Sequence, residues 1–149
     1  MKAAQAYFIL KKTLDFAMRV QSEKEGAVYD PEKVFEFESK IPIIIAGDLN
    51  VEPNDPPFIL LCEGFFTKAA FNRYPAYLKP FKKAKTFRNK LKSAYEFLEF
   101  PPTLKKQAID HILFSEHLEL FSLLDLKQIE VKSNRPSDHF PIMAQFVFN

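Results

Sequence analysis

The sequence is poor in the residues that form covalent and zinc cross-links. Its single cysteine, Cys62, excludes an intrachain disulfide and a zinc site built from several cysteines. A reducing compartment is the simplest setting, so we expect a cytoplasmic protein, with a nuclear or mitochondrial location left open. The sequence also contains no internal repeat and no low-complexity tract. Repeat architectures are therefore excluded.

Long apolar runs are missing as well. The first 20 residues contain one apolar stretch, which Lys11 and Lys12 interrupt and which is too short to span a membrane. The same segment lacks a secretory cleavage site, so we expect no membrane partner. At 149 residues with 47% hydrophobic content, the chain suits one globular domain over residues 1–149.

Acidic residues are absent from one segment. The charges nearly balance overall, at 21 basic and 19 acidic residues, but Lys79 to Lys92 carries seven basic residues and no acidic one. Such a segment suits an anionic ligand, although a solvated lysine-rich loop explains the same pattern. For an RNA or nucleotide phosphate substrate, the expected contact residues are Lys82, Lys83, Lys85 and Arg88.

Two helices are predicted from apolar periodicity and capping residues. Residues 2 to about 22 have the apolar spacing of an amphipathic helix, with Gly26 just beyond its end. A short helix is predicted at 56–63, because an Asn-Asp pair precedes it, prolines occupy its first turn and Gly64 follows it.

The strands are predicted from apolar runs bounded by turn residues. Residues 41–47 (IPIIIAG) form a continuous apolar run, which predicts a fully buried strand. Further strands are predicted at 108–115, 118–126 and 141–148. Residues 29–40 and most of 65–102 are predicted to be loop, with LKSAYEFL left unassigned.

Three polar clusters interrupt these apolar runs. They are Asp48 and Asn50 after the first strand, Asp110 and His111 within the second, and Asp138 and His139 just before the last. Because the ends of neighbouring strands meet at one rim of a sheet, we expect these clusters to converge. Carboxylates, an amide and an imidazole without cysteine suit a hard cation such as Mg²⁺ and a phosphate ester.

Each cluster alone has a simpler explanation. An Asp-x-Asn after a strand is often an Asx turn, and a Ser-Asp-His can cap a turn. Asp110 is harder to explain in this way, because a carboxylate inside a strand costs several kcal/mol of desolvation unless it is paired. A partner such as His139 is therefore implied.

The same segments resemble a known family. AGDLNVEPND, AIDHILFS and RPSDHFPIMAQF are similar, in order, to the last three signature blocks of the endonuclease/exonuclease/phosphatase superfamily. Together with LKSAYEFL and SLLDLKQIE, they most resemble the branch of nocturnin and the poly(A) deadenylases. The resemblance implies an α/β fold, a four-layer α/β/β/α sandwich of mixed β-sheets flanked by helices. It also implies a phosphoesterase site that uses Mg²⁺, with Mn²⁺ as the alternative.

The resemblance implies a role for each matching residue. Asp48 would orient or deprotonate the attacking water, and Asn50 would hold a nonbridging phosphate oxygen or the nucleophile. Asp138 would approach the metal. His139 would stabilise charge on the phosphoryl oxygens, and Asp110 would orient His139. These roles agree with the needs of phosphoryl transfer, which are an in-line nucleophile and neutralisation of charge.

The chain departs from the family in two respects. Family members carry a metal-ligating Glu, an Asn and a His-containing strand in an N-terminal half, and here the resemblance begins at the helix that follows them. We therefore expect a sandwich without its N-terminal part, an exposed apolar sheet face open to a protein partner, and little activity for the chain alone. A fragment, a partial gene model and a degenerate relative are all open explanations. Poly(A)-specific members also place an aromatic residue near the position of Lys105, so adenine preference is not implied.

Three functions are consistent with these residues. The first is a Mg²⁺-dependent phosphodiesterase or phosphatase that acts on RNA 3′ ends, such as poly(A), or on a nucleotide phosphate. The second is a noncatalytic RNA-binding or interaction module derived from the same fold. The third keeps the superfamily but changes the substrate, for example to abasic DNA or sphingomyelin.

Overall fold

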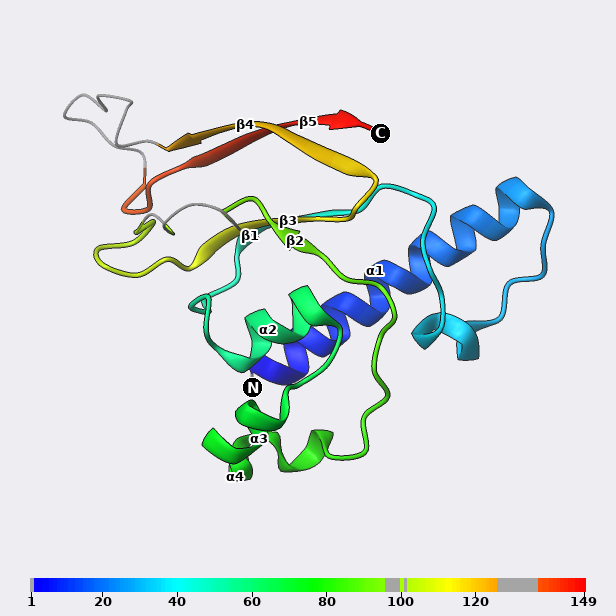
Figure 1. The fold of residues 1–149 in the computed structure, drawn as a ribbon, viewed down its shortest axis with the longest axis horizontal. Helices are drawn as coiled ribbons and strands as arrows, with labels where there is room; N and C mark the ends of the chain where they lie inside the picture. The colour runs from blue at the N-terminus through cyan, green and yellow to red at the C-terminus, as the bar shows by residue number, and fades with distance from the viewer. Residues whose placement is uncertain (1, 96–99, 101, 126–136) are drawn as a thin grey trace.

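The computed structural model describes residues 2–95, 100, 102–125 and 137–149. Figure 1 shows two sheets lying face to face, with α1 (Lys2–Glu25) and α2 (Pro56–Glu63) on the far side of one of them. These layers form a β/β/α arrangement, which agrees in part with the predicted α/β/β/α sandwich. The prediction of mixed sheets was wrong for the described residues, whose strand pairs are all antiparallel. Residues 96–98 of LKSAYEFL, the last residue of the strand predicted at 118–126, and residues 135–136 lie outside the described part.

The helix α1 confirms the first helical prediction and is slightly longer. Its buried side chains recur at helical spacing and belong to the core of the domain; they are Ala3, Ala6, Leu10, Leu14, Ala17 and Met18. Gly26 follows the helix with a φ of 64°, a left-handed conformation that glycine adopts at little cost. None of the helices in the described ranges is long and apolar enough to cross a membrane.

The helix α2 has the predicted bounds. Asp55 precedes it in an extended conformation, and prolines occupy its first turn. Gly64 ends it with a φ of 77°, and its N–H donates to the carbonyl of Leu60 at 2.9 Å. A side chain at Gly64 has no room, because an added Cβ would lie 2.3 Å from the carbonyl oxygen of Phe87.

The segments predicted to be loop contain short helices, so the loop prediction was wrong at these places: η1 (Pro31–Phe35), α3 (Lys68–Arg73), α4 (Pro75–Leu78) and η2 (Lys79–Phe81). The short strand β2 (Lys92–Ser93) lies in LKSAYEFL, which the sequence left unassigned. Local caps explain two of the helices: the Asp30 carboxylate accepts the N–H of Glu32, and the Thr67 hydroxyl accepts the N–H of Ala70. Prolines that suggested loop stand in the first turns of helices, where they are tolerated.

The first sheet has the order β1-β3-β2. The strand β1 (Ile44–Asp48) pairs antiparallel with the central strand β3 (Asp110–Phe114), whose other edge pairs with β2. The second sheet joins β4 (Leu118–Asp125) and β5 (Ile142–Phe148). Ile112 and Phe114 face this second sheet, whereas Leu113 faces the helices, as the alternation of a strand requires. The three later strand predictions are therefore confirmed within the described residues.

The prediction that the first strand is fully buried was wrong. β1 lies at the edge of its sheet, and only Ile45 is half-buried; Ile44 is 51% exposed. β4 and β5 also expose apolar side chains, which are Phe121, Leu124, Met143, Val147 and, at the end of β5, Phe148. β1 therefore combines a continuous apolar sequence with an edge that pairs with no other strand in the described part of the chain.

Candidate metal and phosphoester site

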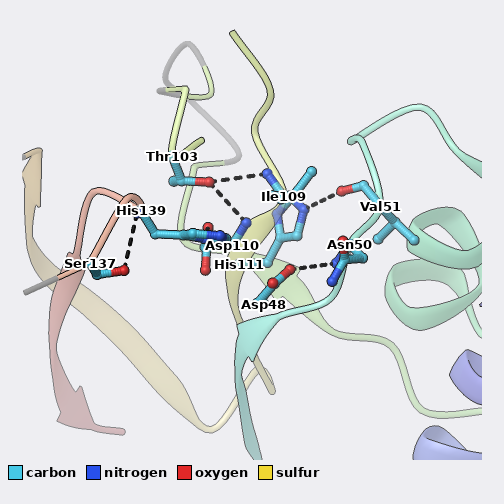
Figure 2. A network of polar contacts seen from close by, with 9 residues as sticks. All are labelled: Asp48, Asn50, Val51, Thr103, Ile109, Asp110, His111, Ser137 and His139. Carbon is cyan, nitrogen blue, oxygen red and sulfur yellow. Dashed lines mark hydrogen bonds and ion pairs between the residues drawn. The ribbon is translucent and has the colours of Figure 1, made fainter. Parts of the chain in front are cut away.

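Three predicted side chains converge at one end of the first sheet. Asp48 ends β1 and Asp110 begins β3, and the two residues are paired in register. His139 comes from the segment before β5. One possible ligand atom from each side chain lies within 4.8 Å of the other two. Figure 2 shows the three side chains and the hydrogen bonds around them.

Asp110 and His139 form the pair that the sequence implied. Nδ1 of His139 donates to Oδ2 of Asp110 at 2.9 Å; the side chain of His139 is 25% exposed and that of Asp110 is 16% exposed. This hydrogen bond is the main reason why the pKa of His139 is raised above its usual value, and desolvation opposes the shift. The negative charges of Asp110, Asp138 and Asp48 raise the pKa of His139 further. The imidazole is thus held as a cation to higher pH than a free histidine.

An Asx turn orients Asp48 and Asn50. Oδ1 of Asp48 accepts the N–H of Asn50 at 2.9 Å, and Asn50 has a φ of 53°, which asparagine tolerates better than most residues. The ammonium group of Lys2 donates to the carbonyl of Asn50, so the first turn of α1 touches this turn. The simpler explanation of the Asp-x-Asn pattern therefore holds locally, and the turn also fixes the direction of the Asp48 carboxylate.

Thr103 joins the elements that carry Asp110 and His139. Its buried hydroxyl accepts the N–H groups of Ile109 and Asp110 at 3.2 and 3.1 Å, and its carbonyl accepts the N–H of Phe140 at 2.7 Å. One residue thereby fixes the start of β3 and the residue after His139. The sequence analysis missed Thr103, because a threonine in a short polar turn carries no signal until its partners are placed.

His111 belongs to the core and not to the site. Neighbouring residues of a strand point to opposite faces, so His111 turns away from Asp110. Its ring is fully buried, packs at 4.7 Å between centroids against Phe58, and has Nε2 2.7 Å from the carbonyl oxygen of Val51. Burial lowers the pKa of His111, and the carbonyl of Val51 partly offsets that shift. The histidine therefore anchors the loop that follows β1.

Asp138 is exposed and is not part of the three-residue group, although its charge acts on His139. Its predicted approach to a metal stays a prediction. The donor set that is present suits a divalent cation, because carboxylate oxygens of Asp48 and Asp110 are the ligands that Mg²⁺ and Mn²⁺ prefer. Oδ1 of Asp110 does not bond to His139 and can still bind a metal ion.

The predicted basic residues lie apart from this group. Lys82, Lys83, Lys85 and Arg88 are all exposed. The ammonium of Lys85 lies 5.2 Å from the centre of the Phe35 ring, and Arg88 pairs with Glu38 at 3.2 Å. The N–H of Phe87 bonds to Gly64 at the C-terminal end of α2, whereas the turn after Asp48 leads to its N-terminal end. Substrate binding by the basic segment stays a prediction.

One hollow opens at the site. It has a volume of about 570 Å³ and is lined by Asp48 and Asn50 together with Lys2, Phe8 and Ile9 of α1. A separate hollow of about 480 Å³ contains none of the three converging residues; it is lined by Glu52, Pro53, Asn54, Phe100, Pro102, Lys105, Lys106 and Ala108.

Comparisons with known proteins place these features in a family. The sequence model described as the endonuclease/exonuclease/phosphatase family matches residues 13–139. Among solved structures, the chain is similar to the human nocturnin catalytic domain with a bound sulfate anion, with 24% sequence identity and a TM-score of 0.54. The match covers 99% of this chain and 41% of that chain, so this chain spans less than half of the nocturnin structure. No curated protein sequence gives a significant match.

Proposed function

Because the chain belongs to the endonuclease/exonuclease/phosphatase family, we propose that its site hydrolyses a phosphoester with the help of a divalent metal ion. The observation that carries this proposal is the convergence of Asp48, Asp110 and His139 at one end of the sheet. The substrates that we propose are RNA 3′ ends or a nucleotide phosphate, because the signature segments resemble those of the nocturnin and deadenylase branch.

The chain's own residues would act as follows. Asp48 orients or deprotonates the attacking water, and Asn50 binds a phosphate oxygen beside it. His139 presents its imidazolium to the phosphoryl oxygens, and the hydrogen bond that its Nδ1–H donates to Asp110 holds the ring in that direction. Asp48 and Asp110 would hold Mg²⁺ or Mn²⁺, with Asp138 nearby. The ion, when bound, supplies positive charge that the phosphate needs in the transition state.

We further propose that the site is completed by a polypeptide segment that pairs with β1. Asp48 and Asp110 would supply two carboxylates, and the other ligands of an octahedral Mg²⁺ would be waters, substrate oxygens or a further carboxylate from the added segment. β1 exposes its second edge, and a strand edge with free N–H and C=O groups is where another strand adds. Its continuous apolar sequence is typical of a strand covered on both sides. The expected partner is therefore a β-strand with apolar side chains.

Metal binding tests the site without requiring turnover. Titration of the metal-free chain with Mn²⁺ should show binding that Asp48→Asn weakens, whereas Glu23→Gln on the exposed surface of α1 should bind Mn²⁺ like the wild type. Oligoadenylate and NADP(H) then serve as substrates, with and without added EDTA. Asp48→Asn should lower any metal-dependent rate by about 100-fold or more.

A noncatalytic binding module is the alternative that one observation favours, namely the exposed edge of β1 beside an incomplete ligand set. Under this alternative, RNA binding depends on salt but not on metal, and Asp48→Asn leaves it unchanged. Metal-dependent release of phosphate or nucleotide by the wild type, lost in Asp48→Asn, would exclude the module. Absence of Mn²⁺ binding both by the chain alone and by the chain with a segment paired to β1 would exclude the phosphoesterase.

A further inference from the structure

Another hollow, of about 480 Å³, adjoins the one that opens at the candidate site, because Lys2 and Pro57 line both of them. It also contains the side chains of Tyr74 and Tyr77, and we call it the tyrosine hollow. We propose that these two tyrosines bind a base of a single-stranded RNA substrate whose reacting phosphate lies at Asp48. This inference rests on the proposed function, and it narrows the substrate from any nucleotide phosphate to an oligonucleotide.

The path from the site to the tyrosine hollow runs over the first turns of two helices. Lys2 begins α1, and its ammonium group donates to the carbonyl of Asn50 in the turn that follows Asp48. Pro57 stands in the first turn of α2. A nucleotide chain bound at Asp48 therefore has a continuous surface to follow. Among the described residues that line the tyrosine hollow none belongs to β1, so the hollow is separate from the edge to which we expect a strand to add.

The aromatic wall is held in place without a ligand. The hydroxyl of Tyr77 accepts the N–H of Ala3 at 2.7 Å, which ties α4 to the start of α1. Leu78 is buried in a small cluster with Ala3 and Ala70, and α3 and α4 lie beside the N-terminal end of α1 (Figure 1). The ring of Tyr74 packs against the same cluster. Because the wall is already ordered, binding costs little conformational entropy.

The lining suits a base. Tyr74, Tyr77 and two prolines of the first turn of α2 supply aromatic and apolar surface, and Tyr77 is 38% exposed. Stacking on aromatic side chains is a common way to bind single-stranded nucleic acid, because every base has a π-face. Asp55 adds a polar group: its Oδ2 accepts the N–H of Glu52 at 3.0 Å, and Oδ1 can accept an amino group of a base.

The surrounding charge suits an RNA backbone. Residues 64–95, which include α3 and α4, contain no Asp or Glu. The guanidinium group of Arg73 lies 5.3 Å from the centre of the Tyr74 ring, and Arg73 is exposed and forms no ion pair within the described ranges. Lys2 is likewise exposed at the passage between the two hollows. Phosphates on either side of a stacked base therefore meet positive charge, and added salt should weaken binding.

Oligoadenylates of different length test the inference. Calorimetry with the chain of residues 1–149 in Mg²⁺ should show that a tetranucleotide binds about tenfold more tightly than AMP, which is the order expected from one stacked base. A tetranucleotide that lacks one base keeps every phosphate. When the missing base is moved along the tetranucleotide, one position should abolish the gain, because only the base at the tyrosines is stacked there.

Variants of the two tyrosines separate stacking from other effects. Tyr74→Leu/Tyr77→Leu removes both rings and should lose the gain, whereas Tyr74→Phe/Tyr77→Phe keeps them and should retain most of it. Both double variants lose the hydrogen bond to the N–H of Ala3, so their comparison isolates the rings. Phe16→Ala removes an exposed aromatic side chain that lines neither hollow, and it should bind like the wild type.

Several outcomes would contradict the inference. Equal gains in the leucine and phenylalanine double variants would show that the rings do not stack on a base. Binding of oligoproline, but not of RNA, that the leucine variant loses would assign the hollow to a peptide instead. Equal affinity for AMP and the tetranucleotide, with metal-dependent AMP binding lost in Asp48→Asn, would refute the tyrosine hollow and leave the proposed function standing. Conversely, a gain that the leucine variant loses but that neither EDTA nor Asp48→Asn affects would support the tyrosine hollow and count against the proposed function.

Discussion

Nδ1 of His139 and Oδ2 of Asp110 lie 2.9 Å apart, although 29 positions separate the two residues in the chain. Asp110 begins the central strand of the first sheet, and His139 precedes a strand of the second. The pair therefore forms only when the two sheets are stacked. Since Asp48 lies opposite Asp110 in register, stacking of the sheets also determines the geometry of the whole candidate site.

Replacing Asp110 should lower the pKa of His139. Asp110→Asn keeps the size of the side chain but removes the negative charge and the main cause of the raised pKa. NMR titration of the His139 ring protons in the metal-free chain measures the shift directly. Asp30→Asn at η1 is the control and should leave the pKa of His139 where it is in the wild type. Coincident titration curves for wild type and Asp110→Asn would contradict the assignment of the cause.

Thr103 should be important for stability out of proportion to its size. Thr103→Val preserves the shape but leaves the buried N–H groups of Ile109 and Asp110 without their acceptor. We expect the free energy of unfolding to fall by about 1–3 kcal/mol, as measured in urea. Thr103→Ser keeps the hydroxyl and should lose less. If Thr103→Val were no more destabilising than Thr103→Ser, the two hydrogen bonds to the hydroxyl would not account for the contribution of Thr103.

Features that depend on neighbouring residues were predictable from the sequence. The helix α2 has the predicted bounds, because prolines at its start and Gly64 at its end act through local backbone conformation. The meeting of Asp48, Asp110 and His139 was also foreseeable, since each follows or precedes an apolar run. Strand ends converge on a rim whatever the details of packing.

Features set by tertiary contacts were not predictable in this way. An apolar sequence shows that a strand can be buried but not whether other elements of the chain pack over it, so the burial of β1 was wrongly predicted. The role of Thr103 depends on partners up to 37 positions away, such as Phe140, which no local pattern reveals. The charge of the basic segment was visible, but not the ion pairs that Arg88 and Lys90 form.

His111 should make folding stability depend on pH. Burial lowers the pKa of His111 in the folded chain, so between that lowered value and the ordinary value near 6.5 the unfolded chain binds more protons. This contribution to stability is complete above about pH 6.5 and declines as the pH falls below it. His139 acts in the opposite sense, because its raised pKa contributes stability at low pH that is lost as the pH rises through the folded value.

Substitution of His111 isolates its share of this dependence. Urea unfolding between about pH 7.5 and pH 5.5 compares the two proteins at each pH. As the pH falls, the stability of the wild type should decrease relative to that of His111→Gln, since glutamine does not titrate. A slope unchanged in His111→Gln would mean that the imidazole is not held neutral in the core.

Gly64 and Gly26 provide a matched pair that separates backbone strain from steric exclusion. Both follow helices with a left-handed φ, of 77° and 64°, so alanine at either position incurs a conformational cost of roughly 1–2 kcal/mol. A Cβ at Gly26 meets nothing within 4 Å, whereas at Gly64 it would lie 2.3 Å from the carbonyl oxygen of Phe87 and 3.1 Å from that of Asn89. Gly64→Ala should therefore lower the free energy of unfolding by clearly more than Gly26→Ala.

The clash at Gly64 also predicts which segment Gly64→Ala destabilises locally. The carbonyl of Gly64 accepts the N–H of Phe87 at 2.8 Å, and the N–H of Leu91 donates to Cys62 at 3.0 Å, so the segment from Phe87 to Leu91 is tied to the end of α2. Amide hydrogen exchange should accelerate in this segment in Gly64→Ala and stay at wild-type rates in Gly26→Ala. Equal stabilities for the two variants would show that residues 87–91 shift at little cost and that the close approach is not a constraint on the fold.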